Sequence, residues 1–253
     1  HYNLGIILAS IGKLQEAEYS YRKAIRLNPN KAEAHNNLGN LLKILGKLQE
    51  AEISTRKAIE LKPDFAEAHS NLGSILNDLG KSKEAEISHR EAIALRPDFA
   101  EAYSNLGAIL RYQGKLNEAE ISINKAIEFK PDFDDAYFNL SSIELIKGNY
   151  KSGLKYYELR FKKKDPVIPH ANPKIKNICS TKLQKGEKLL IVSEQGLGDT
   201  IQYMRYVPYL KSKGFNISFC AQTKLHRLIQ SSGIEKNPLT PEQANQVSEG
   251  TYI

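Results

Sequence analysis

The chain has 253 residues, of which 41% are hydrophobic and 26% charged, a composition typical of globular proteins. No run of eighteen apolar residues is present, so we expect no membrane-spanning segment. The net charge of +7 is modest, and no basic stripe is interleaved with aromatic residues, which argues against a nucleic-acid partner. Cys179 and Cys220 lack paired or metal-type spacing, so we expect free thiols in a reducing, cytoplasmic compartment and no bound metal.

The first two thirds of the chain repeat a Leu-Gly pair that is followed by two alanines and a proline. The complete motif begins at Leu38, Leu72 and Leu106, with a constant interval of 34 residues. Apolar residues at helical spacing predict two helices in each period, the first ended by a left-handed glycine such as Gly46 and the second by a proline such as Pro63. Period and motif resemble the tetratricopeptide repeat, which implies helical pairs stacked into an α-solenoid.

We divide the repeat region, residues 1–164, into five such units. The fifth is atypical because Ser141, Gly153 and Arg160 replace the signature glycine and the two alanines. Such a change is expected where a stack ends or meets another domain. The first unit begins partway through its motif, so we expect the chain to be a fragment with further repeats upstream.

Two more positions recur near the start of most units. An Asp or Asn followed three residues later by Glu, as at Asp64 and Glu67, predicts a capping box at the first helix. A second position carries a ring, which we expect to pack between adjacent units rather than to bind metal, because equivalent rings are a full repeat apart. This position is occupied by His35, His69, Tyr103 and Tyr137.

An asparagine precedes the signature leucine in every unit. These residues are Asn3, Asn37, Asn71, Asn105 and Asn139. Asparagine inside a helix costs about half a kcal/mol relative to alanine, so its recurrence needs a reason. We expect the five side chains to border the groove of the solenoid, where an amide donor and acceptor match a peptide backbone. The alternative is that duplication copied an asparagine that caps neighbouring helices.

The five repeats resemble the superhelical domain of the protein O-linked N-acetylglucosamine transferases, whose inner surface carries an asparagine ladder at this place in the motif. The resemblance implies that the five asparagines hold an extended peptide or protein acceptor.

The pattern breaks over residues 165–187, where prolines and lysines without a periodic apolar face predict a linker. The apolar run 189–192 that follows is typical of a strand buried on both faces of a parallel sheet. The sequence after this run predicts a helix over 200–213, a strand over 216–221 and a helix over 223–230. Residues 188–253 are therefore expected to open a doubly wound, Rossmann-like domain, which makes the whole chain mainly α with a partial α/β segment.

Gly196 and Gly198 follow the first of these strands, and we expect them to form a tight turn that brings backbone N–H groups toward an anion. An ordinary turn is the alternative, because the third glycine of the dinucleotide fingerprint is missing. The stretch 194–203, with Pro208 beyond it, resembles the first β-α unit of bacterial repeat proteins that end in a heptosyltransferase-like, two-Rossmann glycosyltransferase domain. The resemblance implies that Asp199 is the base toward the acceptor hydroxyl, and a helix N-cap is its structural alternative.

The function expected from these patterns is binding of a protein or glycan acceptor by the repeats for an attached glycosyltransferase. The parent enzyme is expected to use a sugar-nucleotide donor. This fragment lacks the second Rossmann half, so we expect it to hold no cofactor and to be inactive alone. The alternative is a non-catalytic tetratricopeptide adaptor whose tail caps the array.

Overall fold

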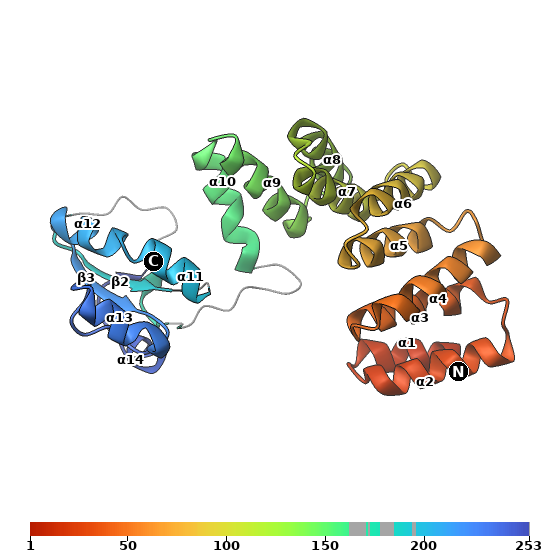
Figure 1. Cartoon of the computed structure of the whole chain (residues 1–253), viewed down its shortest axis with the longest axis horizontal. Coiled ribbons are helices and arrows are strands. Elements are labelled where there is room, and N and C mark those ends of the chain that lie inside the picture. The colour runs from red at the N-terminus through yellow and green to blue at the C-terminus, as the bar shows by residue number, and fades with distance from the viewer. Residues whose placement is uncertain (162–170, 172, 178–184, 194–195, 253) are drawn as a thin grey trace. The chain divides into compact units, whose positions relative to one another are not determined.

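The computed structural model of the chain describes residues 1–161, 171, 173–177, 185–193 and 196–252 (Figure 1). These residues form two compact units, His1–Leu159 and Arg160–Ile253, which are described separately below. Every helix within the described residues is too short or too polar to cross a membrane.

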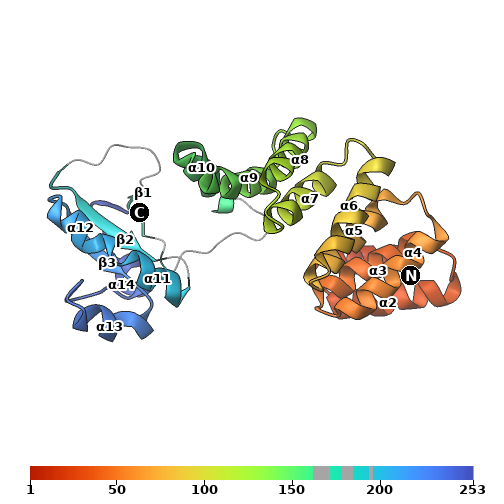
Figure 2. The same ribbon diagram turned by 45° about the horizontal axis from the view of Figure 1, so that its top comes forward.

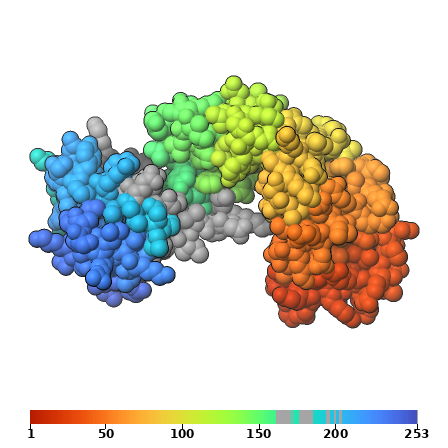
Figure 3. All heavy atoms as spheres, viewed as in Figure 1, coloured from red at the N-terminus to blue at the C-terminus, as the bar shows by residue number. Residues whose placement is uncertain are grey.

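The first unit consists of helical pairs, one pair for each repeat, and each repeat packs directly on the next (Figure 3). Odd-numbered helices are the first helices of their repeats and even-numbered helices are the second. The helices are α1 (Tyr2–Ser10), α2 (Leu14–Leu27), α3 (Ala32–Ile44), α4 (Leu48–Leu61), α5 (Ala66–Asp78), α6 (Ser82–Leu95), α7 (Ala100–Tyr112), α8 (Leu116–Phe129), α9 (Asp134–Ile146) and α10 (Tyr150–Tyr157), followed by the 3-10 helix η1 (Glu158–Phe161).

Glycine occupies two positions of each of the first four repeats for different physical reasons. Gly46 ends α3 with a φ of 73°, the left-handed conformation that other residues adopt only with strain, which confirms the predicted helix stop. Gly73, a signature glycine, lies against the second helix of its own repeat. A Cβ atom there would come within 2.7 Å of the His89 ring, so the absence of a side chain lets α5 and α6 approach closely.

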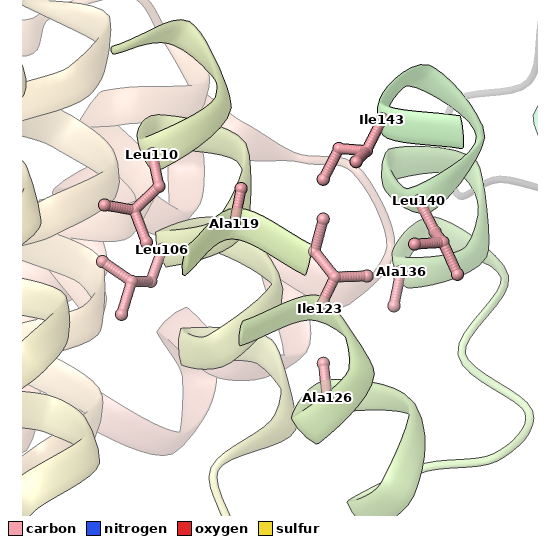
Figure 4. Close-up of a cluster of buried hydrophobic side chains, with 8 residues drawn as sticks. All are labelled: Leu106, Leu110, Ala119, Ile123, Ala126, Ala136, Leu140 and Ile143. Atoms are coloured by element: carbon pink, nitrogen blue, oxygen red, sulfur yellow. The ribbon is translucent and has the colours of Figure 1, made fainter. Parts of the chain in front are cut away.

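The core of the first unit runs along the stack, as the cluster in Figure 4 shows for α7, α8 and α9. Ile123 of α8 is fully buried and lies between Leu106 of α7 and Ile143 of α9. Each repeat therefore buries its apolar face against its neighbours, so the stability of the unit depends on contacts between adjacent repeats.

The first helices line the inner side of the stack. The first helices of adjacent repeats contact each other, α3 with α5 and α7 with α9 for example, whereas the second helices of adjacent repeats are further apart. Helices that lie closer on one side make a stack curve toward that side. Side chains that project from α3, α5 and α7 away from the core therefore face the inner groove.

The predicted capping boxes are wrong. Helix α5 begins at Ala66 with Phe65 as its N-cap, one residue later than predicted, and no side chain accepts a capping hydrogen bond there. The Phe65 N–H donates to the Lys62 carbonyl at 3.1 Å, so a backbone turn sets the start of the helix. Glu67 forms an ion pair with Arg96 instead of reaching back to the helix start.

The second unit contains a small, entirely parallel sheet with the strand order β1-β4-β2-β3. Its strands are β1 (Lys176–Asn177), β2 (Lys188–Val192), β3 (Asn216–Cys220) and β4 (Thr251–Tyr252). The strands predicted over 189–192 and 216–221 are confirmed as β2 and β3. Strand β1 falls inside the segment predicted as a linker, because a two-residue strand is too short to show a periodic apolar pattern.

Helices pack on both faces of this sheet (Figure 2). Leu189 and Phe219 point to the face that carries α12 and α13, whereas Leu190 and Cys220 point to the face that carries α14. This double burial explains the continuous apolar run of β2. The helical elements of the unit are α11 (Leu197–Tyr203), α12 (Tyr206–Ser212), η2 (Thr223–Leu225), α13 (His226–Ser231) and α14 (Pro241–Asn245).

The single helix predicted over 200–213 is wrong, because α11 ends at Tyr203 and α12 begins at Tyr206. Pro208 has no N–H to donate to the Met204 carbonyl, which therefore accepts from the Val207 N–H at 3.0 Å. Pro208 is tolerated where it stands, within the first turn of α12.

Candidate functional site

The five asparagines lie on first helices of the repeats, one residue before the signature leucine, which is exposed in the first repeat and buried in the other four. The side chain of Asn3 is exposed, and the other four, Asn37, Asn71, Asn105 and Asn139, are half-buried. Their places on the inner side agree with the groove position expected from the sequence.

The side-chain amides tie neighbouring first helices together. The Asn71 amide nitrogen donates to Asn36 Oδ1 at 2.9 Å, and Asn36 is only 5% exposed. The other three half-buried amides donate in the same way to a side chain of the preceding repeat, Asn37 to Tyr2 at 3.1 Å, Asn105 to Ser74 at 3.4 Å and Asn139 to Ser104 at 3.1 Å. Each of these four amides therefore joins adjacent repeats, but it does so through a side chain and does not cap a neighbouring helix as the alternative supposed.

At three of these positions the amide oxygen remains available to a ligand. Within the described residues, no donor reaches the Oδ1 atoms of Asn71, Asn105 and Asn139. A carbonyl oxygen at a groove edge can accept from the N–H groups of an extended backbone. Ligand binding by the five asparagines stays a prediction. Their side-chain oxygens would mainly accept hydrogen bonds, because most of the amide nitrogens already donate within the protein.

The exposed apolar residues at the ends of the first helices were not among the residues expected to bind a ligand. Ile44, Tyr112 and Ile146 occupy equivalent positions and are 60%, 76% and 58% exposed. The Arg111 guanidinium stacks on the Tyr112 ring at 4.3 Å from its centroid. The sequence did contain a signal for them. They lie one position beyond the row of buried apolar residues on each first helix, where an apolar side chain faces the groove instead of the core.

The four residues at the ring position, His35, His69, Tyr103 and Tyr137, all make structural contacts. His35 Nε2 lies 2.9 Å from the Pro29 carbonyl, and His69 Nε2 lies equally far from the Pro63 carbonyl. Tyr103 packs on Phe129 with a centroid distance of 5.7 Å, and Tyr137 packs on a ring of α10 in the same manner. In the part of the chain that the structure describes, no cluster of His, Cys, Asp and Glu side chains could hold a metal ion.

The two glycines after β2 lie at the start of a helix. Gly196 is the N-cap of α11 with a φ of −60°, and Gly198 lies inside the helix. Neither adopts a positive φ, and a Cβ on Gly198 would meet no atom within 4 Å, so neither of these two features calls for glycine at 198. The anion-binding role of this loop stays a prediction. Asp199 is the third residue of α11 and not its N-cap. Its side chain lies outside the described part of the structure, and its catalytic role stays a prediction.

A glutamine that the sequence did not single out joins the carboxyl ends of β2 and β3. Gln222 Oε1 accepts from Thr200 Oγ1 at 3.0 Å and from Ser193 Oγ at 3.4 Å. Because β3 and β4 lie on opposite sides of β2, the strand order reverses beside this loop. In open parallel sheets, ligands bind outside the carboxyl ends of the strands at such a reversal.

The cysteines offer no reactive site among the described residues. Cys220 is a free thiol on β3 and is fully buried. Burial raises its pKa to about 11, with a smaller effect of the Glu242 charge, so the thiol is protonated and unreactive at neutral pH. Cys179 lies outside the described residues.

Comparison with protein-family models identifies the repeats directly. A model described as TPR repeat matches residues 5–46, and models described as tetratricopeptide repeat match residues 32–65, 66–99 and 100–133. Together these matches run without a gap from residue 5 to residue 133. No curated protein matches the chain by sequence.

Solved structures with similar folds include MamA, YrrB and PilF. MamA is 27% identical, with a TM-score of 0.54, over 65% of this chain and 96% of MamA. YrrB, described as a TPR protein with an unusual peptide-binding site, is 25% identical, with a TM-score of 0.50, over 64% of this chain and 83% of YrrB. PilF of Pseudomonas aeruginosa is 22% identical, with a TM-score of 0.57, over 62% and 72% of the two chains, and shows the fold alone.

Proposed function

Because this chain belongs to the tetratricopeptide-repeat family through residues 5–133, we propose that its repeat unit binds an extended peptide segment of a partner protein along the inner side of the first helices. Repeats of this kind serve protein–protein interaction. The peptide-binding site named for YrrB supports a peptide ligand here by similarity.

The observation that carries this proposal is the regular row of amide oxygens on successive first helices. Asn71, Asn105 and Asn139 follow one another at a single position of consecutive repeats. Each accepted backbone hydrogen bond contributes about 0.5–1.5 kcal/mol, so several in a row hold a segment with little preference for its side chains. Exposed Tyr112 and Ile146 add apolar contact area for the side chains of the ligand.

The proposal is tested by selecting displayed random peptides on the whole chain and measuring one selected peptide by calorimetry. Tyr112→Ala is expected to weaken binding about tenfold, because an exposed aromatic ring in a groove is a typical binding hot spot. Ile121→Ala is the matched control, since Ile121 is 64% exposed but belongs to the second helix α8. Equal losses in both variants, or no loss in Tyr112→Ala, would contradict an inner-groove site.

We further propose that the second unit is the N-terminal part of a two-Rossmann glycosyltransferase domain to which the repeats present an acceptor. The resemblance of residues 194–203 supports this, together with a parallel sheet that is covered on both faces and whose strand order reverses beside that loop. Asp199 is then the base toward the acceptor hydroxyl, and a sugar nucleotide is the donor. The competing function is a protein-binding adaptor without catalysis.

These two functions are separated by assaying sugar transfer in the natural full-length protein with a panel of sugar nucleotides. Transfer that is lost in Asp199→Asn while peptide binding and melting stay unchanged supports the glycosyltransferase. Peptide binding without transfer from any donor supports the adaptor, and transfer that survives in Asp199→Asn removes this residue from the mechanism.

A further inference from the structure

A second groove lies between the second helices α2 and α4, away from the five asparagines. It has a volume of about 740 Å³, and α3 forms its floor through Leu38 and Leu42. We call it the α2–α4 groove. Cavities of about 300–1,000 Å³ are large enough to bury a ligand or several side chains of a partner.

The walls of the α2–α4 groove expose large apolar side chains. Tyr19 of α2 is 61% exposed and Ile53 of α4 is 71% exposed, and both line the groove. Single exposed apolar residues are common, but two that line the same groove form one apolar contact surface.

The rim of the groove carries more positive than negative charge. Arg22, Arg26 and Lys57 line it together with one carboxylate, Glu50. Arg22 is bound to Glu50 at 2.6 Å, and Lys57 is bound to an exposed glutamate of its own helix. Arg26 makes no ion pair with any described side chain, so its guanidinium is free to bind an anion.

The next repeat keeps the apolar positions of this groove and reverses the charge of its rim. Between α4 and α6, Ile87 corresponds to Ile53, but Glu60 corresponds to Arg26 and Glu91 corresponds to Lys57. Simple duplication of the repeat therefore does not explain the positive rim, which distinguishes the α2–α4 groove from its neighbour.

We propose that the α2–α4 groove binds an acidic peptide segment of a partner protein. A bulky apolar side chain of that segment packs between Tyr19 and Ile53, and flanking carboxylates pair with Arg26 and Lys57. Charge-assisted hydrogen bonds to a guanidinium orient the segment, and the apolar walls supply most of its affinity.

The test uses the whole chain and a fluorescein-labelled peptide in which one phenylalanine is flanked on each side by two acidic residues. Fluorescence polarisation at low ionic strength is expected to show binding, with weaker binding of a counterpart that carries lysines in place of the acids. Arg26→Glu combined with Lys57→Glu is expected to weaken binding by about tenfold or more, because it puts like charges opposite the peptide. Ile53→Ser is expected to weaken it as well, without a change of charge.

Two controls separate this site from general charge effects and from the inner groove. Lys125→Glu repeats the Lys57→Glu half of this charge change at the equivalent position two repeats later, and Tyr112→Ala changes only the inner groove; neither is expected to alter the affinity of the acidic peptide. The double variant is expected to melt like the original chain, since glutamates occupy the equivalent positions of other repeats. The proposal is overturned if the lysine counterpart binds as well, if a peptide without the phenylalanine binds as well, or if Lys125→Glu weakens binding equally.

Discussion

His89 gives the sharpest prediction, because the structure buries an ionisable ring in an apolar place. The side chain is fully buried on α6 opposite Gly73, and neither ring nitrogen has a hydrogen-bond partner. Desolvation, together with the positive charge of Lys43, lowers the pKa of His89 to about 4 from an ordinary value of 6.5. The native state therefore holds this ring neutral, whereas the unfolded chain protonates it near pH 6.5.

The sign and size of the effect follow from this difference in pKa. The unfolded state binds the proton more tightly, so the stability present above pH 6.5 is lost as the pH falls toward 4. Between pH 7.5 and pH 5.5 this one group lowers the free energy of unfolding by about 1 kcal/mol. Glu18, Glu52 and Glu86 contribute little in this range, because ion pairs hold their pKa values below the ordinary carboxylate range.

The perturbation is His89→Ile, because Ile123 occupies the equivalent place two helices later. Removing two buried ring nitrogens that lack partners is expected to stabilise the protein by about 1–3 kcal/mol at pH 7.5. Urea unfolding of both proteins at pH 7.5, 6.5 and 5.5 is expected to show this advantage growing by about 1 kcal/mol toward the lowest pH. Equal pH dependence in the two proteins would refute the assignment of a buried, neutral His89.

Three further changes test the packing between helices. Gly73→Ala is expected to destabilise the fold by about 1–3 kcal/mol, since its Cβ would crowd the His89 ring, and thermal melting should show partial recovery in Gly73→Ala with His89→Ala. Asn71→Ala is expected to cost about 1–3 kcal/mol by leaving buried Asn36 Oδ1 without a donor, whereas exposed Asn3→Ala changes the melting temperature little; equal effects would contradict the bond between repeats. Lys81→Ala is expected to cost about 0.5 kcal/mol by releasing Glu52, and this loss disappears in 1 M salt and as the pH falls through the lowered pKa of Glu52. A loss that persists at high salt indicates packing of the lysine stem instead.

The repeat unit was predictable because its environment is periodic. Once Leu38 and Gly46 are assigned, a shift of 34 residues assigns the same burial and the same helix end in the next repeats. The core and the helix stops follow from that rule. The place of His89 in the core also follows from it, but the lack of any partner for its ring depends on the side chains that surround it, which the period does not reveal.

The features that the sequence did not predict depend on offsets of one residue or on long-range pairing. The start of α5 falls at Ala66 because a backbone turn satisfies Phe65, so Asp64 stands one residue too early to cap the helix. Strand β1 exists only through its pairing with β4, which no local pattern encodes. Pro208 was a local signal for the break before α12. The regular spacing of apolar residues across 200–213 concealed this signal, because it continued through the break.

The position of the ligand tests the central claim of inner-groove binding most directly. In a titration of the ¹⁵N-labelled chain with a selected peptide, the side-chain amide signals of Asn71, Asn105 and Asn139 can be followed by NMR. We predict that these signals shift and saturate together with the backbone signals of α5, α7 and α9. Shifts confined to the second helices, with the three asparagine amides unchanged at saturation, would contradict the account.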